Sequence, residues 1–228
     1  GDGYADLIDA FDDDATQTHD TDQDGFGDNP LGINADDCPT VYGNSTVDRR
    51  GCEDRDGDGV SDLQDSFPDD PTRSADSDGD GFSDIEDDCW DIPGTSTNGR
   101  LGCVDADFDT WDDQTDAFEL DPTQWNDTDG DGFGDNWADE GLNATRSQTN
   151  IGQWVENATQ SDHCPETSGN SSLDFFGCVD GDGDGWSLIT DSFDTDVSEW
   201  NDTDSDGFGD NQDVCPAISG SATNGSIG

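Results

Sequence analysis

The sequence has almost no positive charge and few residues with which to build an apolar core. Its 228 residues include six Lys and Arg in total, no lysine and no methionine, against 59 acidic residues, so the formal net charge is −53. Such a charge excludes nucleic acid and anionic membranes as partners, because both are polyanionic. Leu, Ile, Val and Phe together number 35, a proportion typical of intrinsically disordered chains. A conventional hydrophobic core is therefore excluded.

Long apolar runs are also missing. No stretch approaches the roughly 18 consecutive apolar residues that a membrane-spanning helix requires, and the sequence shows neither an initial Met nor a signal peptide. We therefore expect no membrane insertion by this segment, and we expect it to be a mature or excised piece of a protein.

Glutamate is scarce among the acids, which are 52 Asp and 7 Glu. Acidic disorder and a halophilic acidic surface are the two simple explanations of such a charge, but both normally use glutamate freely. Aspartate is the short carboxylate of turn-forming calcium loops. The bias therefore favours ion-ligand geometry over either alternative.

Seven cysteines are present, and six of them form pairs with the same separation of 14 residues. Regular cysteine spacing in a chain without a core predicts a disulfide framework in an oxidising, extracellular compartment. Zinc binding is the alternative, but no pair has the close Cys or His partners of a zinc site. The paired cysteines are Cys38 and Cys52, Cys89 and Cys103, and Cys164 and Cys178.

The chain consists of tandem repeats. Each unit holds two copies of a twelve-position pattern, D-x-D-x-D-G-x-x-D-x-x-D, whose first residues lie 22 apart, as at Asp54 and Asp76. Such self-similarity predicts a quasi-linear array. The expected units are residues 1–51, 52–102, 103–177 with an insertion at 136–163, and 178–228.

The first and last units fit the register as cut copies. The residue that would pair with Cys215 falls one position after Gly228. We therefore expect a longer array in which Cys215 pairs with a cysteine beyond this segment, and the alternative is a processed protein with a free Cys215 or a disulfide to another chain.

The repeated pattern predicts calcium sites. In such a loop the side chains at positions 1, 3, 5, 9 and 12 converge with the carbonyl of position 7, and glycine at position 6 permits the turn. We expect about eight or more Ca²⁺ ions, one or more per loop. The predicted metal ligands are Asp2, Asp6, Asp9, Asp20, Asp22, Asp24, Asp28, Asp36, Asp54, Asp56, Asp58, Val60, Asp62, Asp65, Asp76, Asp78, Asp80, Phe82, Asp84, Asp87, Asp105, Asp107, Asp109, Trp111, Asp113, Asp116, Asp127, Asp129, Asp131, Phe133, Asp135, Asp162, Asp180, Asp182, Asp184, Trp186, Asp191, Asp202, Asp204, Asp206, Phe208, Asp210 and Asp213.

Four loops deviate from the pattern. In two of them an interruption puts Leu31 or Ala138 at position 12, yet an aspartate stands two residues before the following cysteine. We predict that the insertions are looped out and that these aspartates are the retained final ligands. Leu188 replaces the acid at position 9, and Thr110 replaces the turn glycine. We expect weaker binding in those two loops.

The loops resemble EF-hands only locally, because position 12 is Asp and no helical periodicity flanks them; the same absence disfavours a dockerin-like module. The segment Asp202-Thr-Asp-Ser-Asp-Gly-Phe-Gly-Asp-Asn-Gln-Asp213-Val-Cys215-Pro216 resembles the thrombospondin type 3 repeat, and the match covers nearly the whole chain. The resemblance implies an irregular chain wrapped round a string of calcium ions, with disulfides between neighbouring cysteines. Similar arrays occur in archaeal and bacterial surface proteins.

The fold class that follows is irregular, with little regular secondary structure, a linear array of calcium loops and disulfide staples. Asp121 and Pro122 begin a segment in which an Asp cap precedes Pro, as at a helix start, so we expect short single-turn helices between paired loops. The apolar residues at position 7 and the Phe that follows position 12 predict small packing clusters, with a carbohydrate-binding strip as the alternative.

Seven tripeptides match the N-glycosylation acceptor sequence. Each alone is a weak signal, but several fall where exposure is expected, so we predict N-linked glycans on some of them. They begin at Asn44, Asn126, Asn143, Asn157, Asn170, Asn201 and Asn224.

The sequence predicts a structural function, that of a calcium-rigidified spacer, stalk or glycosylated filament subunit at a cell surface, in contact with copies of itself. The alternative is a calcium-dependent adhesion or glycan-binding module. An enzyme is not expected, because His19 and His163 are isolated and acids committed to calcium are poor general acids.

Overall fold

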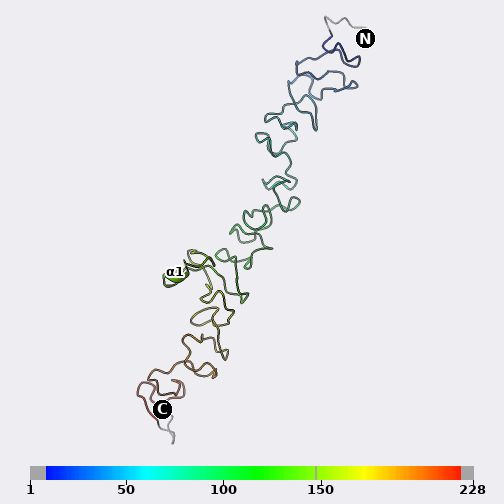
Figure 1. The fold of residues 1–228 in the computed structure, drawn as a ribbon. Helices are drawn as coiled ribbons and strands as arrows, with labels where there is room; N and C mark the ends of the chain where they lie inside the picture. Colours follow the sequence, from blue (N-terminus) through cyan, green and yellow to red (C-terminus); the bar gives the residue numbers. More distant parts are fainter. Residues whose placement is uncertain (1–8, 147, 222–228) are drawn as a thin grey trace. The chain divides into compact units, whose positions relative to one another are not determined.

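The chain is irregular almost throughout. The computed structural model describes residues 9–146 and 148–221, and within them the only regular element is helix α1, Glu140–Arg146 (Figure 1). The remaining described residues form turns, bends and isolated β-bridges. Aspartate and glycine favour turns over helices and strands, so the prediction of an irregular fold with little regular secondary structure is confirmed.

The chain divides into two compact bodies. The N-terminal body comprises residues 1–94 and 101–103, and the C-terminal body comprises residues 95–100 and 104–228. The division falls inside the segment between Cys89 and Cys103, next to the boundary expected between the second and third repeat units. Three predicted residues, Asp2, Asp6 and Asn224, lie outside the described part of the chain.

Three disulfides staple the bodies internally. They join Cys38 to Cys52, Cys89 to Cys103 and Cys164 to Cys178, with Cα–Cα distances of 5.1, 5.1 and 5.0 Å. The predicted disulfide framework is therefore confirmed, and the zinc alternative for these cysteines is excluded. Cys215 is an exposed free cysteine.

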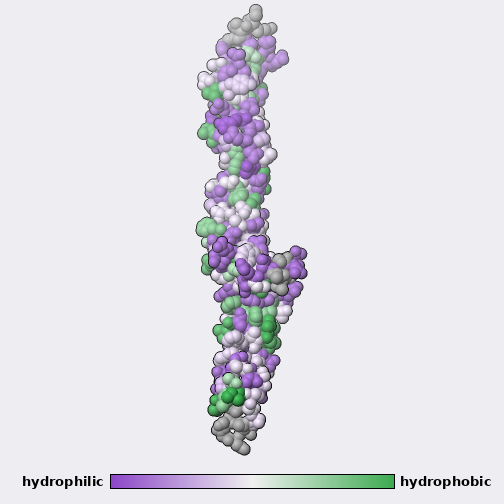
Figure 2. Space-filling model, turned by 90° about the vertical axis from the view of Figure 1, so that its left-hand side faces the viewer, coloured by the Kyte–Doolittle hydropathy of each residue, from purple (hydrophilic) through white to green (hydrophobic). Residues whose placement is uncertain are grey.

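Polar groups rather than apolar ones fill the interior. Among the described residues, the buried apolar residues are Trp137 and the second cysteine of each disulfide, whereas many aspartates and serines are buried. The position-7 residues are only half-buried. Hydrophobic and hydrophilic residues alternate over the visible face in Figure 2 and do not gather into one apolar face. Folding therefore depends on satisfying buried carboxylates more than on apolar burial.

The segment at Asp121 is a turn, so the prediction of a single-turn helix there was wrong. Gln124 N–H donates to the Asp121 carbonyl at 2.9 Å, and Thr123 N–H donates to Asp121 Oδ1 at 3.1 Å. Forming a single helical turn fixes the backbone angles of three residues but gains only one hydrogen bond. It is therefore unfavourable unless further turns follow. Here the Gln124 side chain leaves the turn to bond Asn136 and Thr159.

The insertion carries the helix and the one buried aromatic of the described chain. Trp137 pairs with Trp154 in a β-bridge, and the guanidinium carbon of Arg146, at the end of α1, lies 5.4 Å from the centroid of the Trp137 ring. Arg146 Nη2 donates to the Asp135 carbonyl at 2.8 Å. These contacts attach the insertion to the loop that begins at Asp127.

Candidate metal centres

Each repeated loop is shaped by two residues with positive φ, at positions 4 and 6. In the Asp54 loop these are Gly57 and Gly59, with φ of 83° and 99°, a region that glycine enters without strain. The turn directs their N–H groups at Asp54, whose Oδ1 accepts from Gly57 at 2.7 Å and whose Oδ2 accepts from Gly59 at 3.0 Å. The sequence pattern predicted the position-6 glycine but not the second turn at position 4.

This turn brings the carboxylates of positions 1, 3 and 5 together. In each such group every residue offers one oxygen, and the three oxygens lie within 4.8 Å of one another. Two further groups of possible ligands are found in the described residues. The groups at positions 1, 3 and 5 include Asp20, Asp22 and Asp24; Asp54, Asp56 and Asp58; Asp76, Asp78 and Asp80; Asp105, Asp107 and Asp109; and Asp127, Asp129 and Asp131.

The position-3 carboxylates show the clearest sign of a missing partner. In every described loop the Oδ2 atom at this position is buried and has no hydrogen-bond partner. The other oxygen generally accepts the N–H of position 5, as Asp56 Oδ1 does from Asp58 at 3.1 Å. The residues with this unpartnered oxygen are Asp22, Asp56, Asp78, Asp107, Asp129, Asp182 and Asp204.

Burying these oxygens without a hydrogen-bond partner costs free energy, and the size of this cost bears on whether they are metal ligands. Leaving a buried acceptor unpaired costs about 1–3 kcal/mol, and more when the group is charged. Repeated in seven loops, the cost is roughly 7–20 kcal/mol, which equals or exceeds the whole stability of a typical domain, about 5–15 kcal/mol. A cation that coordinates these oxygens would remove this cost, and the residues present fit a hard metal ion.

The position-12 aspartate is held by the same two hydrogen bonds in each of the seven loops from Asp20 onward. In the uninterrupted Asp76 loop, Asp87 N–H donates to the Ser83 carbonyl at 2.9 Å, and Asp87 Oδ1 accepts Cys89 N–H at 2.6 Å. Asp36 and Asp162 make the same two bonds, to the carbonyl at position 8 and from Cys38 or Cys164. Both also keep a buried, unpartnered Oδ2.

The interruptions therefore leave the loop geometry intact. The bridge between Gly27 and Ala35 and the bridge between Gly134 and Ser161 close the necks of the two inserted segments. Asp36 and Asp162 thus occupy the backbone position of an ordinary position-12 aspartate, as the spacing from the cysteine predicted.

Backbone carbonyls at position 7 are available as ligands. Throughout the described residues none of these carbonyls accepts a hydrogen bond, although the N–H of the same residue donates to position 5, as Phe82 does to Asp80 at 2.9 Å. An unpaired carbonyl in the same loop as a carboxylate group is a candidate further oxygen ligand. These carbonyls belong to Phe26, Val60, Phe82, Trp111, Phe133, Trp186 and Phe208.

The position-9 carboxylates have a different geometry from the other predicted ligands. Asp84 accepts the N–H of Ser77 at 2.7 Å on one oxygen and the Ser77 hydroxyl at 2.7 Å on the other. Its own N–H donates to the Ala75 carbonyl. We call this pair of bonds, accepted by the position-9 carboxylate from the N–H and hydroxyl of position 2, the clasp. The clasp also forms at Asp28, Asp135 and Asp210. The five groups described above contain no position-9 residue.

Burial and mutual repulsion raise the pKa values of several of these carboxylates. Burial, with repulsion from Asp24 and Asp22 added, raises the pKa of Asp36 to about 6. Burial, together with Asp131 and Asp129, raises the pKa of Asp162 to about 7, although the Arg146 guanidinium opposes the rise. Burial likewise raises the pKa of Asp109 to about 6. Such shifts arise where negative charge is concentrated without a compensating cation.

The two deviant loops keep the backbone hydrogen bonds that close the other loops. Thr110 takes the turn glycine's conformation with φ of 88°, and its N–H still donates to Asp105 Oδ2 at 3.0 Å. Leu188 lacks the position-9 clasp, yet its N–H donates to the Val179 carbonyl at 2.8 Å. The loop therefore closes in both, and the expected weakening of binding stays a prediction.

The cysteine loop between Cys38 and Cys52 binds the calcium-type loop that precedes it and the one that follows it. Gly43 N–H donates to Asp24 Oδ2 at 3.2 Å, and Thr46 N–H donates to the Gly59 carbonyl at 2.8 Å. Asp48 accepts both the N–H and the hydroxyl of Ser61, at 2.8 and 2.6 Å. Sequence reasoning missed these residues, although their fixed offset from the cysteine was a usable signal.

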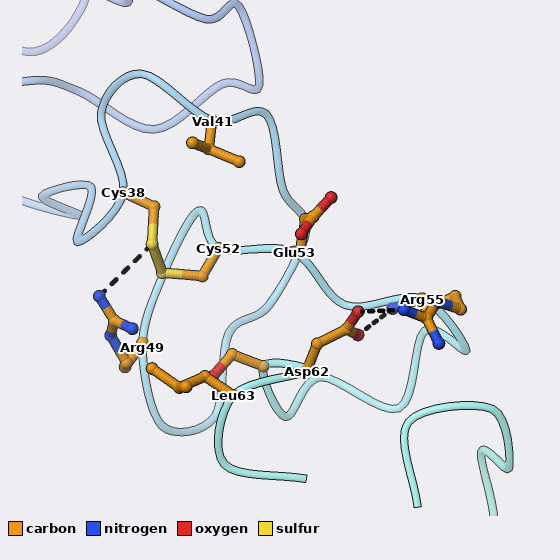
Figure 3. A pocket seen from close by; sticks show the side chains of 9 residues that line it. Cys38, Val41, Arg49, Cys52, Glu53, Arg55, Asp62 and Leu63 are labelled. Atoms are coloured by element: carbon orange, nitrogen blue, oxygen red, sulfur yellow. Dashed lines mark hydrogen bonds and ion pairs between the residues drawn. A yellow bond between two sulfur atoms is a disulfide. The ribbon is translucent and has the colours of Figure 1, made fainter.

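A shallow hollow of about 400 Å³ adjoins the first disulfide (Figure 3). Val41 and Leu63 form its apolar lining, and Arg55 pairs there with Asp62 at 3.3 Å. Arg49 lies against the Cys38 sulfur at 3.4 Å. The hollow lacks a group of acids for a metal or a nucleophile with a base, so it is not the candidate site.

No helix among the described residues is long and apolar enough to cross a membrane. Comparison with protein-family models and with curated proteins gives no match. The assignment of function therefore depends on the geometry of the loops.

Proposed function

We propose that this chain is an extracellular calcium-binding structural protein whose repeats are rigidified by bound Ca²⁺. The observation that supports the proposal is the set of buried, unpartnered Oδ2 atoms at position 3 of every described loop. Binding of ions to such groups supplies folding free energy directly, because the carboxylates repel one another without them.

Calcium is the metal that this donor set suits best. All the donors are oxygens, from three or four carboxylates and one carbonyl per loop, and Ca²⁺ takes six to eight oxygen ligands in flexible geometry. Mg²⁺ demands a near-ideal octahedron and keeps several waters. Zn²⁺ prefers nitrogen and sulfur, whereas the paired cysteines are in disulfides.

The irregular fold, the disulfides and the loop pattern together support membership of the thrombospondin type 3 class. Disulfides persist in oxidising compartments, which supports a position outside the cell or on its surface. About eight divalent ions carry roughly 16 positive charges, so most of the formal charge of −53 stays uncompensated. A spacer, stalk or glycosylated filament subunit, in contact with copies of itself, suits such a chain better than a catalyst.

Ion counting tests the proposal. The chain is stripped with chelator, dialysed against Ca²⁺ and analysed for bound metal, and its hydrodynamic radius is measured in both states. We expect about eight or more ions and a smaller radius with calcium. The idea fails if the chain takes up no ions, or if chelator leaves the radius unchanged.

A matched pair of variants assigns the ions to the loops. Asp56→Asn alters the buried position-3 oxygen, and Asp91→Asn makes the same charge change at an exposed residue. We expect the first to lower the count by about one ion and the second to leave it unchanged.

A calcium-dependent glycan-binding module is the second candidate. Trp186 and Trp200 stack with their ring centroids 6.1 Å apart and nearly parallel, and Trp200 is 36% exposed. Aromatic faces of this kind also bind sugar rings. Binding to a glycan array in calcium that is lost in Trp200→Ala would favour this candidate over an inert spacer.

A further inference from the structure

Two of the exposed N-glycosylation sequons overlap the start of a metal-binding loop. Residues 125–128 and 200–203 have the same sequence, Trp-Asn-Asp-Thr. In each, the Asp is position 1 of the loop and the Thr is position 2. The asparagines are exposed, so burial alone does not prevent modification of either one.

The folded loop engages the whole sequon at Asn201. The Asn201 carbonyl accepts the Asp210 N–H at 2.9 Å, and Asn201 Nδ2 donates to Asp210 Oδ2 at 2.6 Å. Thr203 donates its N–H to Asp210 Oδ1 at 2.9 Å and its hydroxyl to Oδ2 at 2.7 Å. Asn201 Nδ2 also donates to Thr203 Oγ1 at 3.0 Å. One aspartate thus holds the amide and the hydroxyl of the acceptor sequence.

The sequon at Asn126 is held in part. The Asn126 carbonyl accepts the Asp135 N–H at 2.9 Å, and the Thr128 hydroxyl donates to Asp135 Oδ2 at 2.6 Å. Asp135 is 1% exposed, so this clasp is shielded from water. The repeat of the arrangement in two loops shows that it belongs to the loop geometry.

Glycan transfer needs these same groups. The reaction joins Asn Nδ2 to the anomeric carbon of a sugar carried on a lipid diphosphate. The bond between that carbon and the phosphate oxygen breaks, the diphosphate leaves with the electron pair, and Nδ2 loses a proton. The transferase recognises the sequon hydroxyl, which is why Ser or Thr is required. Both groups must therefore be free of their bonds within the loop.

We propose that closure of the loop blocks its own sequon, so that Asn201 accepts an N-glycan only before the Asp202 loop has folded. The proposal goes beyond calcium binding, because it concerns the clasp formed by Asp210 and not the ions. Asn201 and Asn126 are then modified during export or not at all.

The sequon at Asn170 provides the contrast within the same chain. Asn170 and Ser172 use only backbone groups, donating their N–H to the carbonyls of Cys178 and Gly185 at 3.1 and 2.9 Å. In the described part of the chain neither the Asn170 amide nor the Ser172 hydroxyl makes a hydrogen bond, and Asn170 is exposed. The folded protein leaves this sequon open.

The Asp180 loop shows which substitution at position 9 is suitable for the test. Leu188 occupies position 9 of the Asp180 loop, and that loop still closes, with Asp180 accepting from Gly183 and Gly185 at 2.7 and 2.8 Å. Asp210→Leu therefore frees the Asn201 sequon in a loop type that tolerates leucine. Asp194→Leu makes the same change at an exposed residue outside the clasp.

The experiment treats the whole disulfide-bonded chain, in calcium, with an oligosaccharyltransferase and a lipid-linked oligosaccharide, and measures occupancy at each asparagine by mass spectrometry. The reduced and denatured chain shows that every sequon is a competent acceptor. We expect Asn170 to be modified in the folded chain and Asn201 to be modified at about one-tenth of its rate in the denatured chain, which corresponds to one or two charge-assisted hydrogen bonds.

Asp210→Leu should raise modification of Asn201 about tenfold and leave Asn170 unchanged, whereas Asp194→Leu should change neither. Equal modification of Asn170 and Asn201 in the wild-type fold would overturn the proposal. So would an unmodified Asn170, or an Asp210→Leu variant in which Asn201 stays protected. Ion counts on the same samples report separately on calcium binding, so failure of the proposed function is distinguishable from failure of the clasp.

Discussion

Thr110 is a β-branched residue in a backbone conformation that suits glycine. Its φ of 88° is close to that of the position-6 glycines in the other loops, such as Gly59 at 99°. A left-handed conformation costs an L-residue about 1–2 kcal/mol. Replacing the residue by glycine removes this strain, but the greater conformational entropy of glycine in the unfolded chain offsets part of the stabilisation. We expect Thr110→Gly to raise the free energy of unfolding by about 1 kcal/mol in calcium.

Thr110→Ala is the control for that prediction. It removes the hydroxyl that accepts a bond from Asn98 Nδ2 at 2.7 Å but keeps a Cβ at positive φ, so only the glycine variant relieves the strain. Chemical denaturation with excess Ca²⁺ measures both. If alanine stabilises the protein as much as glycine, backbone strain at this position is not the cause.

Glu199 occupies a place that two other repeats give to glutamine. Gln17 and Gln124 are each 1% exposed, and their Nε2 atoms donate to two backbone carbonyls. Glu199 is 2% exposed and accepts Asn211 N–H at 3.1 Å, but its Oε1 is buried without a partner. Glu199→Gln restores a donor, so we expect a gain of about 1–2 kcal/mol in the free energy of unfolding.

The reverse change, Gln124→Glu, serves as the matched test. It removes two donated bonds inside a buried site, so thermal or denaturant unfolding should show a loss of about 2–3 kcal/mol. The interpretation of the buried glutamines is wrong if the two substitutions change stability in the same direction.

Prediction from sequence succeeded at residues where spacing carries the information. The offset from the cysteine identified Asp36 and Asp162, because a looped-out insertion leaves the position-12 residue beside the same backbone. It did not identify the clasp of position 9, since an aspartate that binds a metal and one that bonds position 2 look alike in a pattern. The assignment of Asp84 and Asp210 as ligands stays a prediction.

The cysteine loop is the element that couples neighbouring calcium-type loops. In two repeats an aspartate ten residues after the first cysteine, Asp48 or Asp174, accepts the N–H and hydroxyl of a serine at position 8, Ser61 or Ser187. Burial acts to raise the pKa of Asp48, but the hydrogen bonds from Ser61 and from neighbouring N–H groups lower it below the usual value.

The cysteine loop between Cys89 and Cys103 exchanges the two partners. Gly99 stands where the others have aspartate, and position 8 is Asp112, whose Oδ2 accepts Arg100 N–H at 2.8 Å. A Cβ at Gly99 would clash with Thr115 Oγ1 and with Asp112 Oδ2, so a side chain at position 99 does not fit beside the Asp112 carboxylate as it stands. The pair is a compensating swap that conserves one bridging carboxylate.

A double-mutant cycle tests this swap. Gly99→Asp alone introduces a clash and a like charge, and Asp112→Ser alone removes the bridge, so we expect losses of about 2 and 1–2 kcal/mol. Together they restore the pairing of an aspartate with a serine, although the Gly99 φ of 70° still strains any L-residue there, so the combined loss should stay above zero but be smaller than the sum by at least about 1 kcal/mol. Additive losses in denaturant unfolding would show that the two positions are independent.

Sequence patterns were weaker at the scale of elements. The cap-like Asp121 and Pro122 suggested a helix, but the side chain of Gln124 is drawn into the Asp127 loop and only a turn forms. The real helix, α1, lies in the insertion, where Arg146 and Trp137 anchor it by contacts that no local period in the sequence encodes.

At the scale of the whole molecule, the dominant physical quantity is negative charge without a partner. The formal charge is −53, and Arg55 and Arg73 form salt bridges with nearby carboxylates. Unfolded polyanionic chains relieve such repulsion by expanding. If the loops bind ions as proposed, folding and ion uptake are coupled, and we expect both to depend on pH.

The sign of this pH dependence follows from the raised pKa values of three carboxylates. The pKa values of Asp36 and Asp109 rise to about 6 and that of Asp162 to about 7, from an ordinary value of 3.8, mainly through burial. Without ions the fold keeps protons that the unfolded chain has already released. The ion-free fold therefore loses stability as pH rises from about 4 to 7.

Calcium reverses this dependence because it binds the ionised carboxylates and displaces their protons. We expect about one to three protons released per chain on calcium binding at pH 5.5 and almost none at pH 8, measured by calorimetry in two buffers with different ionisation enthalpies. At pH 6.5 most of the release should come from Asp162, so Asp162→Asn should remove most of it and leave the smaller share of Asp36 and Asp109. Proton release that is equal at pH 5.5 and 8 would mean that the loops are not assembled before the ion arrives, because carboxylates in an open chain are already ionised in this range.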